Sequence, residues 1–298
     1  MKDNRSYTSA AVAQVSFSKW EDYKMLVKVK LSAVVVITSM LAYAVAAAGQ
    51  FAWVELLLLS VGGFLVTAAA NAINQVLEKD FDKLMQRTEM RPVTAGRMKS
   101  SEAVMFAGIS LLIGVTLLSM FNPITSFLGM LSFVMYAFVY TPLKRYSTLA
   151  VAVGAIPGAL PVLIGCTAAQ GEVTVLALSL FVIQFLWQFP HFWSIGYLAF
   201  DDYDRAGYKL MPSDDQGVKR DLGINSVIYA LLVLPVALLL YYAGDGSMIA
   251  TAMTVVATLI YTYYSWMFHK QFDRKSARSL MFCSFFYMPI VLLAYLMF

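Results

Sequence analysis

Nine apolar stretches, each close to twenty residues long, constrain the fold of this chain more than any other feature of its sequence. They cover residues 31–48, 53–75, 101–120, 123–141, 148–168, 173–199, 226–243, 247–268 and 279–298. A helix of about 20 apolar residues spans the hydrocarbon core of a bilayer. Because backbone groups in lipid must be hydrogen-bonded within the spanning structure, we predict an all-α, polytopic membrane bundle of about nine transmembrane helices, with residues 31–298 as one domain.

The distribution of charge supports this topology independently. Only 13% of residues are charged, against about a quarter in soluble proteins, and all 22 Lys and Arg lie before the first stretch or after the even-numbered ones. The positive-inside rule then places the N-terminus in the cytoplasm and Phe298 on the opposite face of a bacterial inner membrane. The net charge of +4 therefore reflects topology, and the expected partner is the lipid bilayer, with no nucleic acid.

Residues 1–30 precede the first predicted span and are expected to form a cytoplasmic segment. They lack an apolar core behind a short basic start, and Asp3, Glu21 and Asp22 argue against a transit peptide. The run from Trp20 to Leu26 is typical of an interfacial helix that lies along the bilayer. We therefore predict an N-terminal interfacial segment ahead of the bundle.

Oxygen-bearing side chains recur every four residues where the second predicted span ends. Asn74, Glu78 and Asp82 share one face of a helix, with a rise of about 6 Å between neighbours. Mg²⁺ takes few carboxylates and keeps its other positions for water and substrate phosphates, so these three donors suit it. Arg87 and Arg91 repeat the spacing and are placed to bind phosphate oxygens. The alternative is a solvated, charge-paired helix end, although such helices rarely begin their charges at a membrane border.

Two further polar segments lie on the same predicted face. The long connection after the sixth span opens with the acids Asp201, Asp202 and Asp204, which are candidates for a second metal site. In the connection after the fourth span, Lys144 and Arg145 lie at the membrane border, where they are available to an anionic group. A plain positive-inside anchor explains these two bases equally well. The long connections on one side indicate that function lies on the cytoplasmic face.

The fifth and sixth spans contain residues that are unusual in membrane helices. Residues that permit either close helix approach or a break interrupt span five: Gly154, Pro157, Gly158, Pro161 and Gly165. In span six, Gln184, Gln188 and His191 share one face at positions i, i+4 and i+7. The two glutamines indicate ligand contact or interhelical hydrogen bonding with similar weight, whereas the ionisable His191 favours a functional role.

Together these segments are typical of a membrane prenyltransferase. Two facing acidic clusters would hold one or two Mg²⁺ ions and, through them, a diphosphate whose charge Lys and Arg side chains offset. An aromatic-lined bundle beneath would shelter an isoprenoid tail and stabilise the cation left after ionisation. A secondary transporter is the rival class, but transporters keep ionisable residues near the bilayer midplane, whereas nearly every acid here lies at the cytoplasmic edge.

Several blocks of the sequence resemble the UbiA prenyltransferase superfamily, and they occur in its order. The spacing Asn74-x-x-x-Glu78-x-x-x-Asp82, with Arg87-Thr88 and Arg91-Pro92 after it, resembles the first aspartate-rich motif of that superfamily. The blocks that resemble its haem O synthase branch in particular are Tyr140-Thr141-Pro142-Leu143-Lys144-Arg145, Trp187 to Trp193, and Asp202-Tyr203 with Ala206-Gly207 and Met211-Pro212. The similarity extends from Trp20 to at least Pro212.

The resemblance implies a reaction and its participants. Members of that branch transfer a farnesyl group from farnesyl diphosphate to a vinyl carbon of haem B, and water adds to give haem O for terminal oxidases. Mg²⁺ is the implied cofactor, and haem A synthase or oxidase assembly factors are the candidate protein partners. A UbiA-type enzyme acting on a quinone precursor or a chlorin is the alternative, and the Trp187-to-Trp193 block discriminates between the two.

The resemblance also implies residue roles. The catalytic candidates are Asn74, Glu78, Asp82 and Asp202, and the metal-ligand candidates are the same four residues with Asp201. The substrate-binding candidates are Arg87, Arg91, Tyr140, Lys144, Arg145, Gln188 and His191, of which His191 would orient or ligate the haem. The run Lys28-Val29-Lys30 departs from the Lys-Pro-Arg that the family commonly has ahead of the first span, which weakens any role carried over to it.

Overall fold

The structure is a computed structural model that describes residues 17–50, 52–215 and 217–298. Within these residues, nine helical segments are long and apolar enough to cross a membrane, which confirms the predicted all-α membrane bundle. The largest differences from the predicted boundaries are at the starts of the seventh and ninth spans, which begin at Asp221 and Arg274 because their polar first turns are already helical. Residues 1–16 of the predicted N-terminal segment lie outside the described residues.

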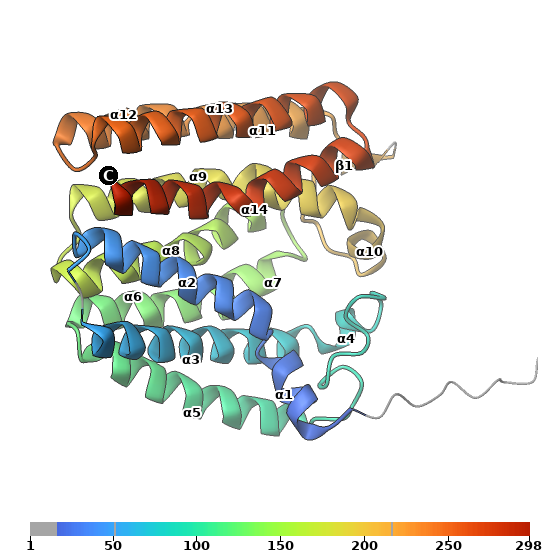
Figure 1. Cartoon of the computed structure of the whole chain (residues 1–298). Helices are drawn as coiled ribbons and strands as arrows, with labels where there is room; N and C mark the ends of the chain where they lie inside the picture. The colour runs from blue at the N-terminus through green and yellow to red at the C-terminus, as the bar shows by residue number, and fades with distance from the viewer. Residues whose placement is uncertain (1–16, 51, 216) are drawn as a thin grey trace, which may run out of the picture.

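Figure 1 shows the elements in their order along the chain. They are α1 (Lys19–Leu26), α2 (Val29–Ala46), α3 (Trp53–Leu77), α4 (Lys79–Asp82), α5 (Ser100–Ser119), α6 (Pro123–Val134), the π-helix η1 (Met135–Tyr140), α7 (Thr141–Leu143), α8 (Ala150–Gln170), α9 (Val175–Leu198), α10 (Phe200–Arg205), β1 (Ser213–Asp214), β2 (Gly217–Val218), α11 (Asp221–Leu231), α12 (Val233–Ala243), α13 (Met248–Gln271) and α14 (Arg274–Met297). The two short strands pair antiparallel, Ser213 with Val218, in an otherwise helical protein.

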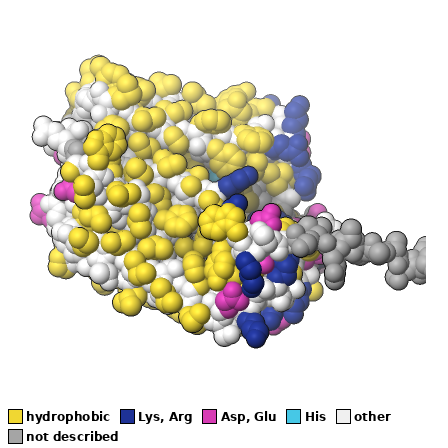
Figure 2. Space-filling model, turned by 60° about the horizontal axis from the view of Figure 1, so that its bottom comes forward, with side chains coloured by type: hydrophobic (Ala, Val, Ile, Leu, Met, Phe, Trp, Pro, Cys, Tyr) yellow, Lys and Arg dark blue, Asp and Glu magenta, His cyan; other side chains and the backbone are white. Residues whose placement is uncertain are grey.

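The long helices pack in successive layers, with α5 at one side, α11 to α13 at the other, and α2, α8 and α9 between them (Figure 1). The short elements α1, α4, α10 and β1 gather at one end of the bundle, hereafter the basic face. Figure 2 shows Lys and Arg side chains at one end of the visible surface and apolar side chains across the rest. Large apolar side chains such as Leu112 and Phe286 are about two-thirds exposed, as expected for a surface that contacts lipid.

Polar residues define where several spans begin. Asn122, Thr174 and Ser247 each accept a hydrogen bond from the backbone N–H three residues later, which caps α6, α9 and α13. Pro123 follows Asn122 at the first helical position, where a missing N–H has no consequence. Asp273 and Ser276 form a reciprocal capping box at the start of α14. These caps fix the helix ends and hence the register in which side chains face one another.

Helix α8 lies in the middle of the bundle and is continuous despite two internal prolines, Pro157 and Pro161. Its glycines serve close packing, because a Cβ at Gly165 would clash with the backbone of α2 near Tyr43. Of the two possibilities predicted for span five, the structure therefore has close approach. The interruption occurs in span four instead, where α6 passes into the π-helix η1.

Helix α1 confirms the predicted helix near residues 20–26, and it packs onto the protein at the basic face. Asp22 is 2% exposed and pairs with Arg97, whose Nε lies 2.8 Å from Asp22 Oδ1. The Tyr23 hydroxyl donates to Glu102 at the start of α5. These contacts fix the segment that leads into α2. Its orientation along a bilayer stays a prediction.

Candidate active site

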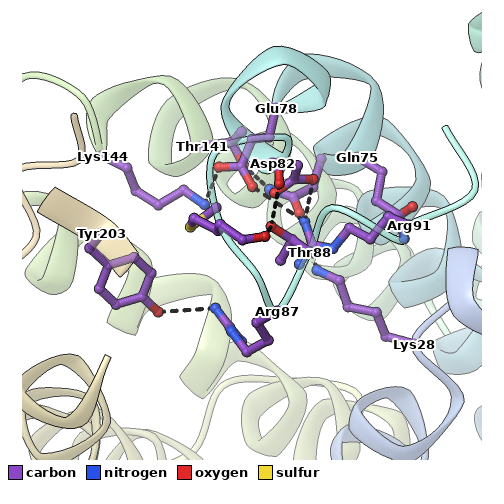
Figure 3. Close-up of polar contacts among 12 residues, drawn as sticks. Lys28, Gln75, Glu78, Asp82, Arg87, Thr88, Arg91, Thr141, Lys144 and Tyr203 are labelled. Carbon is purple, nitrogen blue, oxygen red and sulfur yellow. Dashed lines mark hydrogen bonds and ion pairs between the residues drawn. The ribbon is translucent and has the colours of Figure 1, made fainter. Parts of the chain in front are cut away.

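The predicted oxygen ladder lies where α3 ends. Helix α3 stops at Leu77, Glu78 is the joint, and α4 continues the chain. The backbone N–H of Glu78 donates to the Asn74 carbonyl (3.0 Å), and that of Asp82 donates to the Glu78 carbonyl (2.8 Å), so the four-residue spacing continues across the joint. Asn74, Glu78 and Asp82 are 1%, 5% and 0% exposed, so all three side chains are buried in the protein. Figure 3 shows Glu78 and Asp82 side by side.

Three basic side chains surround this ladder (Figure 3). Lys144 forms an ion pair with Glu78, and Arg91 NH1 lies 2.6 Å from Asp82 Oδ2 and 3.9 Å from Glu78 Oε2. The Lys28 ammonium donates to Asn74 Oδ1 at 3.1 Å. Three basic side chains thus face two carboxylates in a largely buried site, which carries a net positive charge when all five groups are ionised. Because an uncompensated buried charge is costly, this excess of positive charge favours an anionic ligand.

Burial and charge compete in setting the pKa values of these groups. Burial raises the pKa of Asp82 above its usual value, and the neighbouring Arg91 only partly opposes the shift. Burial acts in the same direction on Glu78, but Lys144, Lys28 and Arg91 together lower its pKa below the usual value. Burial lowers the pKa of Lys28 to about 7, and the positive charge of Arg91 adds to the effect. These ionisable groups are therefore held away from water, which shifts their pKa values, as is common at functional sites.

Lys28 is a site residue to which the sequence analysis assigned no role. It lies between α1 and α2 with a positive φ of 49°, a left-handed backbone conformation that residues other than glycine rarely adopt. Buried amides of α3 hold this junction: Asn71 donates to the Val27 carbonyl, and Gln75 donates to the Met25 and Leu26 carbonyls. The usable signal was this pair of amides inside an apolar span, since buried amides require partners.

The remaining predicted bases lie near the ladder without contacting it. Arg87 NH2 donates to the Tyr203 hydroxyl at 3.4 Å, so this side chain lies between α4 and α10 (Figure 3). The Arg145 guanidinium lies over the Phe81 ring, 4.1 Å from its centroid. Of the four predicted bases, the structure therefore brings Arg91 and Lys144 into the cluster and places Arg87 and Arg145 at its border.

The second acidic segment is more exposed than the first. Asp202 forms an ion pair with Arg205 of the same short helix, and Asp201 is exposed. Among residues 17–50, 52–215 and 217–298, no group of three or more His, Cys, Asp or Glu side chains is arranged to hold a metal ion. A second ion bound through Asp201 and Asp202 stays a prediction.

The ladder nevertheless fits a hard divalent cation. Its donors are two carboxylates and one amide oxygen, and Asp82 Oδ1 is buried without a hydrogen-bond partner among the described residues. Mg²⁺ keeps several of its positions for water and substrate phosphates, so few protein ligands are required. Asn74, Glu78 and Asp82 are therefore the residues that could hold it.

An apolar cavity of about 210 Å³ extends into the bundle beside the ladder. Its lining residues come from α2, α3, α6, η1, α8 and α9: Leu31, Val35, Val66, Thr67, Ala70, Asn71, Ser132, Tyr136, Tyr140, Gly154, Pro157, Gly158, Pro161 and Phe192. The π-helix places Tyr136 and Tyr140 on this wall with ring centroids 5.5 Å apart. The Lys144 ammonium lies 5.1 Å from the Tyr140 ring centroid, so the charged cluster and the cavity adjoin.

The polar stripe of α9 makes contacts between helices. Gln188 donates to the Ala155 carbonyl at 2.9 Å, and Gln184 approaches the Gly158 carbonyl at 3.5 Å. His191 Nδ1 lies 2.7 Å from the Ser284 hydroxyl of α14, and its ring stacks on Trp187. Of the two roles predicted for the glutamines, these contacts match interhelical hydrogen bonding. A substrate contact of Gln188 or His191 stays a prediction.

Comparison with known proteins identifies the family of this chain. The model of the UbiA prenyltransferase family matches residues 35–287. A protoheme IX farnesyltransferase of Cytophaga hutchinsonii is 37% identical over 94% of this chain and 98% of its own length. The solved structure of a digeranylgeranylglyceryl phosphate synthase superposes with a TM-score of 0.79, at 18% identity over 94% of this chain and 98% of that one.

A UbiA homologue from Archaeoglobus fulgidus, solved with GPP and Mg²⁺ bound, superposes with a TM-score of 0.64 at 17% identity, over 92% of this chain and 99% of that one. The two solved structures share the fold, and the sequence relatives share identity over nearly the full length. This chain therefore belongs to the UbiA prenyltransferase family.

Proposed function

We propose that this prenyltransferase is a haem O synthase, which transfers a farnesyl group from farnesyl diphosphate to a vinyl carbon of haem B. The observation that carries the proposal is a charged cluster beside an apolar cavity, in which Lys144, Glu78 and Asp82 are buried and Lys28 and Arg91 are half-buried. Its excess positive charge suits a diphosphate, and the cavity suits an isoprenoid tail. Relatives that are 35–37% identical over nearly the whole chain are named protoheme IX farnesyltransferases, which supports the same substrates here.

The basic side chains hold the donor in this proposal. Lys28, Arg91 and Lys144 bind the diphosphate oxygens, and Arg87 approaches them from the side of Tyr203. Asn74, Glu78 and Asp82 hold Mg²⁺, which when bound supplies further positive charge to the leaving diphosphate. The structure of the Archaeoglobus homologue with GPP and Mg²⁺ supports a metal-dependent donor site. Asp202, and Asp201 beside it, contribute to a second ion when Asp202 is released from Arg205.

The cavity supplies the environment for bond cleavage. The bond between C1 of the farnesyl group and the diphosphate oxygen breaks, and the diphosphate leaves with the electron pair. The rings of Tyr136 and Tyr140 line the wall where the allylic cation forms, and their faces stabilise it. The terminal vinyl carbon of the acceptor then bonds to C1, and water adds to the resulting cation and loses a proton, which gives the hydroxyethylfarnesyl chain of haem O.

The acceptor site is assigned to the basic face and α9. Arg145 offers a positive charge to the haem propionates at the edge of the cluster. Gln188 and His191 orient the haem from α9, where Phe192, the residue next to His191, already lines the donor cavity. With the N-terminus in the cytoplasm of a bacterial inner membrane, substrates reach the site from the cytoplasmic side, and haem A synthase or an oxidase assembly factor receives the product.

The decisive experiment is mass analysis of haem after incubation of the purified protein in liposomes with farnesyl diphosphate, haem B and Mg²⁺. Haem O is expected in the complete mixture and in none of the mixtures that lack one component. A parallel incubation with a quinone precursor or a chlorin in place of haem B tests the other acceptors of the family. Prenylation of one of these without any haem O would overturn the proposal.

A further inference from the structure

The donor cavity has a defined deep end. On each of four helices, one cavity-lining residue lies farther from the basic face than the others, and together these residues form the deep end. They are Val35 of α2, Val66 of α3, Ser132 of α6 and Pro161 of α8. Val66 precedes Asn74 by eight residues on one continuous helix, so it lies about 12 Å deeper in the bundle. A prenyl tail whose diphosphate binds at Asn74 therefore points at Val66.

Around Val66, on the side away from the basic face, side chains pack directly against glycines of neighbouring helices. A Cβ at Gly114 of α5 would lie 3.0 Å from Val66 Cγ2, and a Cβ at Gly129 of α6 would lie 2.6 Å from Leu118 Cδ1. Val66 is 4% exposed and Leu118 is 0% exposed. The glycines at these crossings thus allow Val66 and Leu118 to occupy space that would otherwise continue the cavity downward.

We propose that Val66, backed by Leu118, sets the longest prenyl chain that this enzyme accepts. The inference rests on the proposed prenyl transfer and assigns the chain-length limit to named residues. A tail with a fourth isoprene unit would have to displace two fully packed side chains from a crossing of three helices, which a close-packed interior resists. Replacing Val66, the floor of the cavity, by a smaller residue removes that obstacle, whereas a larger side chain at the same depth shortens the cavity.

Three variants test the floor from both directions. Val66→Ala lengthens the cavity, and Ser132→Leu adds an apolar side chain at the same depth from α6. Val61→Ala is the matched control, because Val61 is on the same helix but 41% exposed on the outer surface. Each protein is given equal concentrations of geranyl, farnesyl and geranylgeranyl diphosphates with haem B, and the prenylated haems are separated by mass. Competition within one tube makes the product ratio independent of the amount of folded protein.

Val66→Ala is expected to raise the ratio of geranylgeranyl to farnesyl product by roughly tenfold or more, since even one methylene in an apolar pocket changes selectivity by that order. Ser132→Leu is expected to shift the ratio toward the geranyl product, and Val61→Ala to leave it unchanged. Unchanged ratios in both cavity variants, with farnesyl transfer intact, would overturn the floor assignment alone. Absence of any prenylated haem with the unsubstituted protein would instead contradict the proposed function. Leu118→Ala, which leaves the cavity lining intact but removes the support, should shift the ratio in the same direction as Val66→Ala.

Discussion

Replacing Asp82 by Asn is expected to abolish prenyl transfer without unfolding the protein. Asp82 is 0% exposed, and one of its oxygens, Oδ1, has no hydrogen-bond partner among the described residues, so this oxygen is available to bind the proposed metal ion. The amide keeps the shape of the side chain but removes the charge that would bind the cation. Loss of one preorganised electrostatic contact typically lowers kcat by 10²–10³-fold, or about 3–4 kcal/mol, so a loss of at least that size is expected.

The stability of this variant follows from the sign of the pKa shift. Burial raises the pKa of Asp82 in the folded protein, so the folded state favours the protonated form relative to the unfolded state. The ionised carboxylate at this position therefore opposes folding, and Asn removes this penalty. Asn also retains an oxygen that can accept from Arg91 at the position of Oδ2. The free energy of unfolding is expected to fall by less than about 1 kcal/mol, well below the 3–5 kcal/mol typical of a broken buried ion pair.

Two measurements on the same preparations check this reasoning. Haem product is quantified by mass analysis, and thermal unfolding is followed in detergent for the unsubstituted protein, Asp82→Asn and the control Asp80→Asn. Asp80 is two residues away on α4, but its side chain is 80% exposed and pairs with Lys83, which is also exposed, so its replacement should change neither quantity. Transfer by Asp82→Asn within a few-fold of the unsubstituted protein, or an equal loss in Asp80→Asn, would refute the assignment of Asp82 to the metal.

Four other outcomes are expected. Chelation with EDTA should stop haem O formation and added Mg²⁺ should restore it, as measured by product mass; activity that persists in EDTA would remove the metal from the proposal. Lys28→Met should raise the KM for farnesyl diphosphate roughly tenfold or more, because the ammonium that lies at Asn74 would no longer donate to the diphosphate, whereas replacing the exposed Lys30 of α2 by Met should not; steady-state kinetics decide. His191→Phe, which keeps an aromatic ring beside Trp187, should raise the KM for haem about tenfold and leave that for farnesyl diphosphate nearly unchanged, and equal changes in both would exclude an acceptor role. Arg97→Met should lower the free energy of unfolding by about 1–3 kcal/mol because Asp22 loses its buried partner, with Lys99→Met as the control in the thermal melt.

Much of the fold could be predicted because hydropathy and charge act over whole helices. The nine spans of the described residues and the position of nearly every base follow from segment length and the exclusion of charge from lipid, and neither depends on detailed packing. What could not be predicted was the place of the helix interruption. The prolines and glycines of span five allowed either a break or close helix approach, but α8 is a continuous helix, and the π-helix arose in span four, whose two prolines, Pro123 and Pro142, both lie outside it. Tertiary packing decided both cases.

The candidate site likewise has residues whose positions could be predicted from the sequence and others whose positions could not. The four-residue spacing of Asn74, Glu78 and Asp82 is a local property, so their shared face could be predicted from the sequence. Lys28 reaches Asn74 across 46 residues, through a left-handed backbone conformation that nothing local requires. Arg145 was expected beside the phosphate with Lys144, yet adjacent residues at a helix end point in different directions, and its guanidinium lies on Phe81.

Helix α3 connects the head of the site to its floor. It is a single helix of 25 residues, Trp53–Leu77, with no proline to bend it. Asn74 and Val66 lie on this one rigid element, so in the proposed donor site the distance between the diphosphate and the end of the tail is set by helix rise and not by the packing of separate segments. The α1–α2 junction is also fastened to α3, through Asn71 and Gln75, which places Lys28 relative to the same helix. A substitution that shifts α3 along its axis should therefore change the head group contacts and the chain-length limit together, whereas one confined to Val66 should change the limit alone.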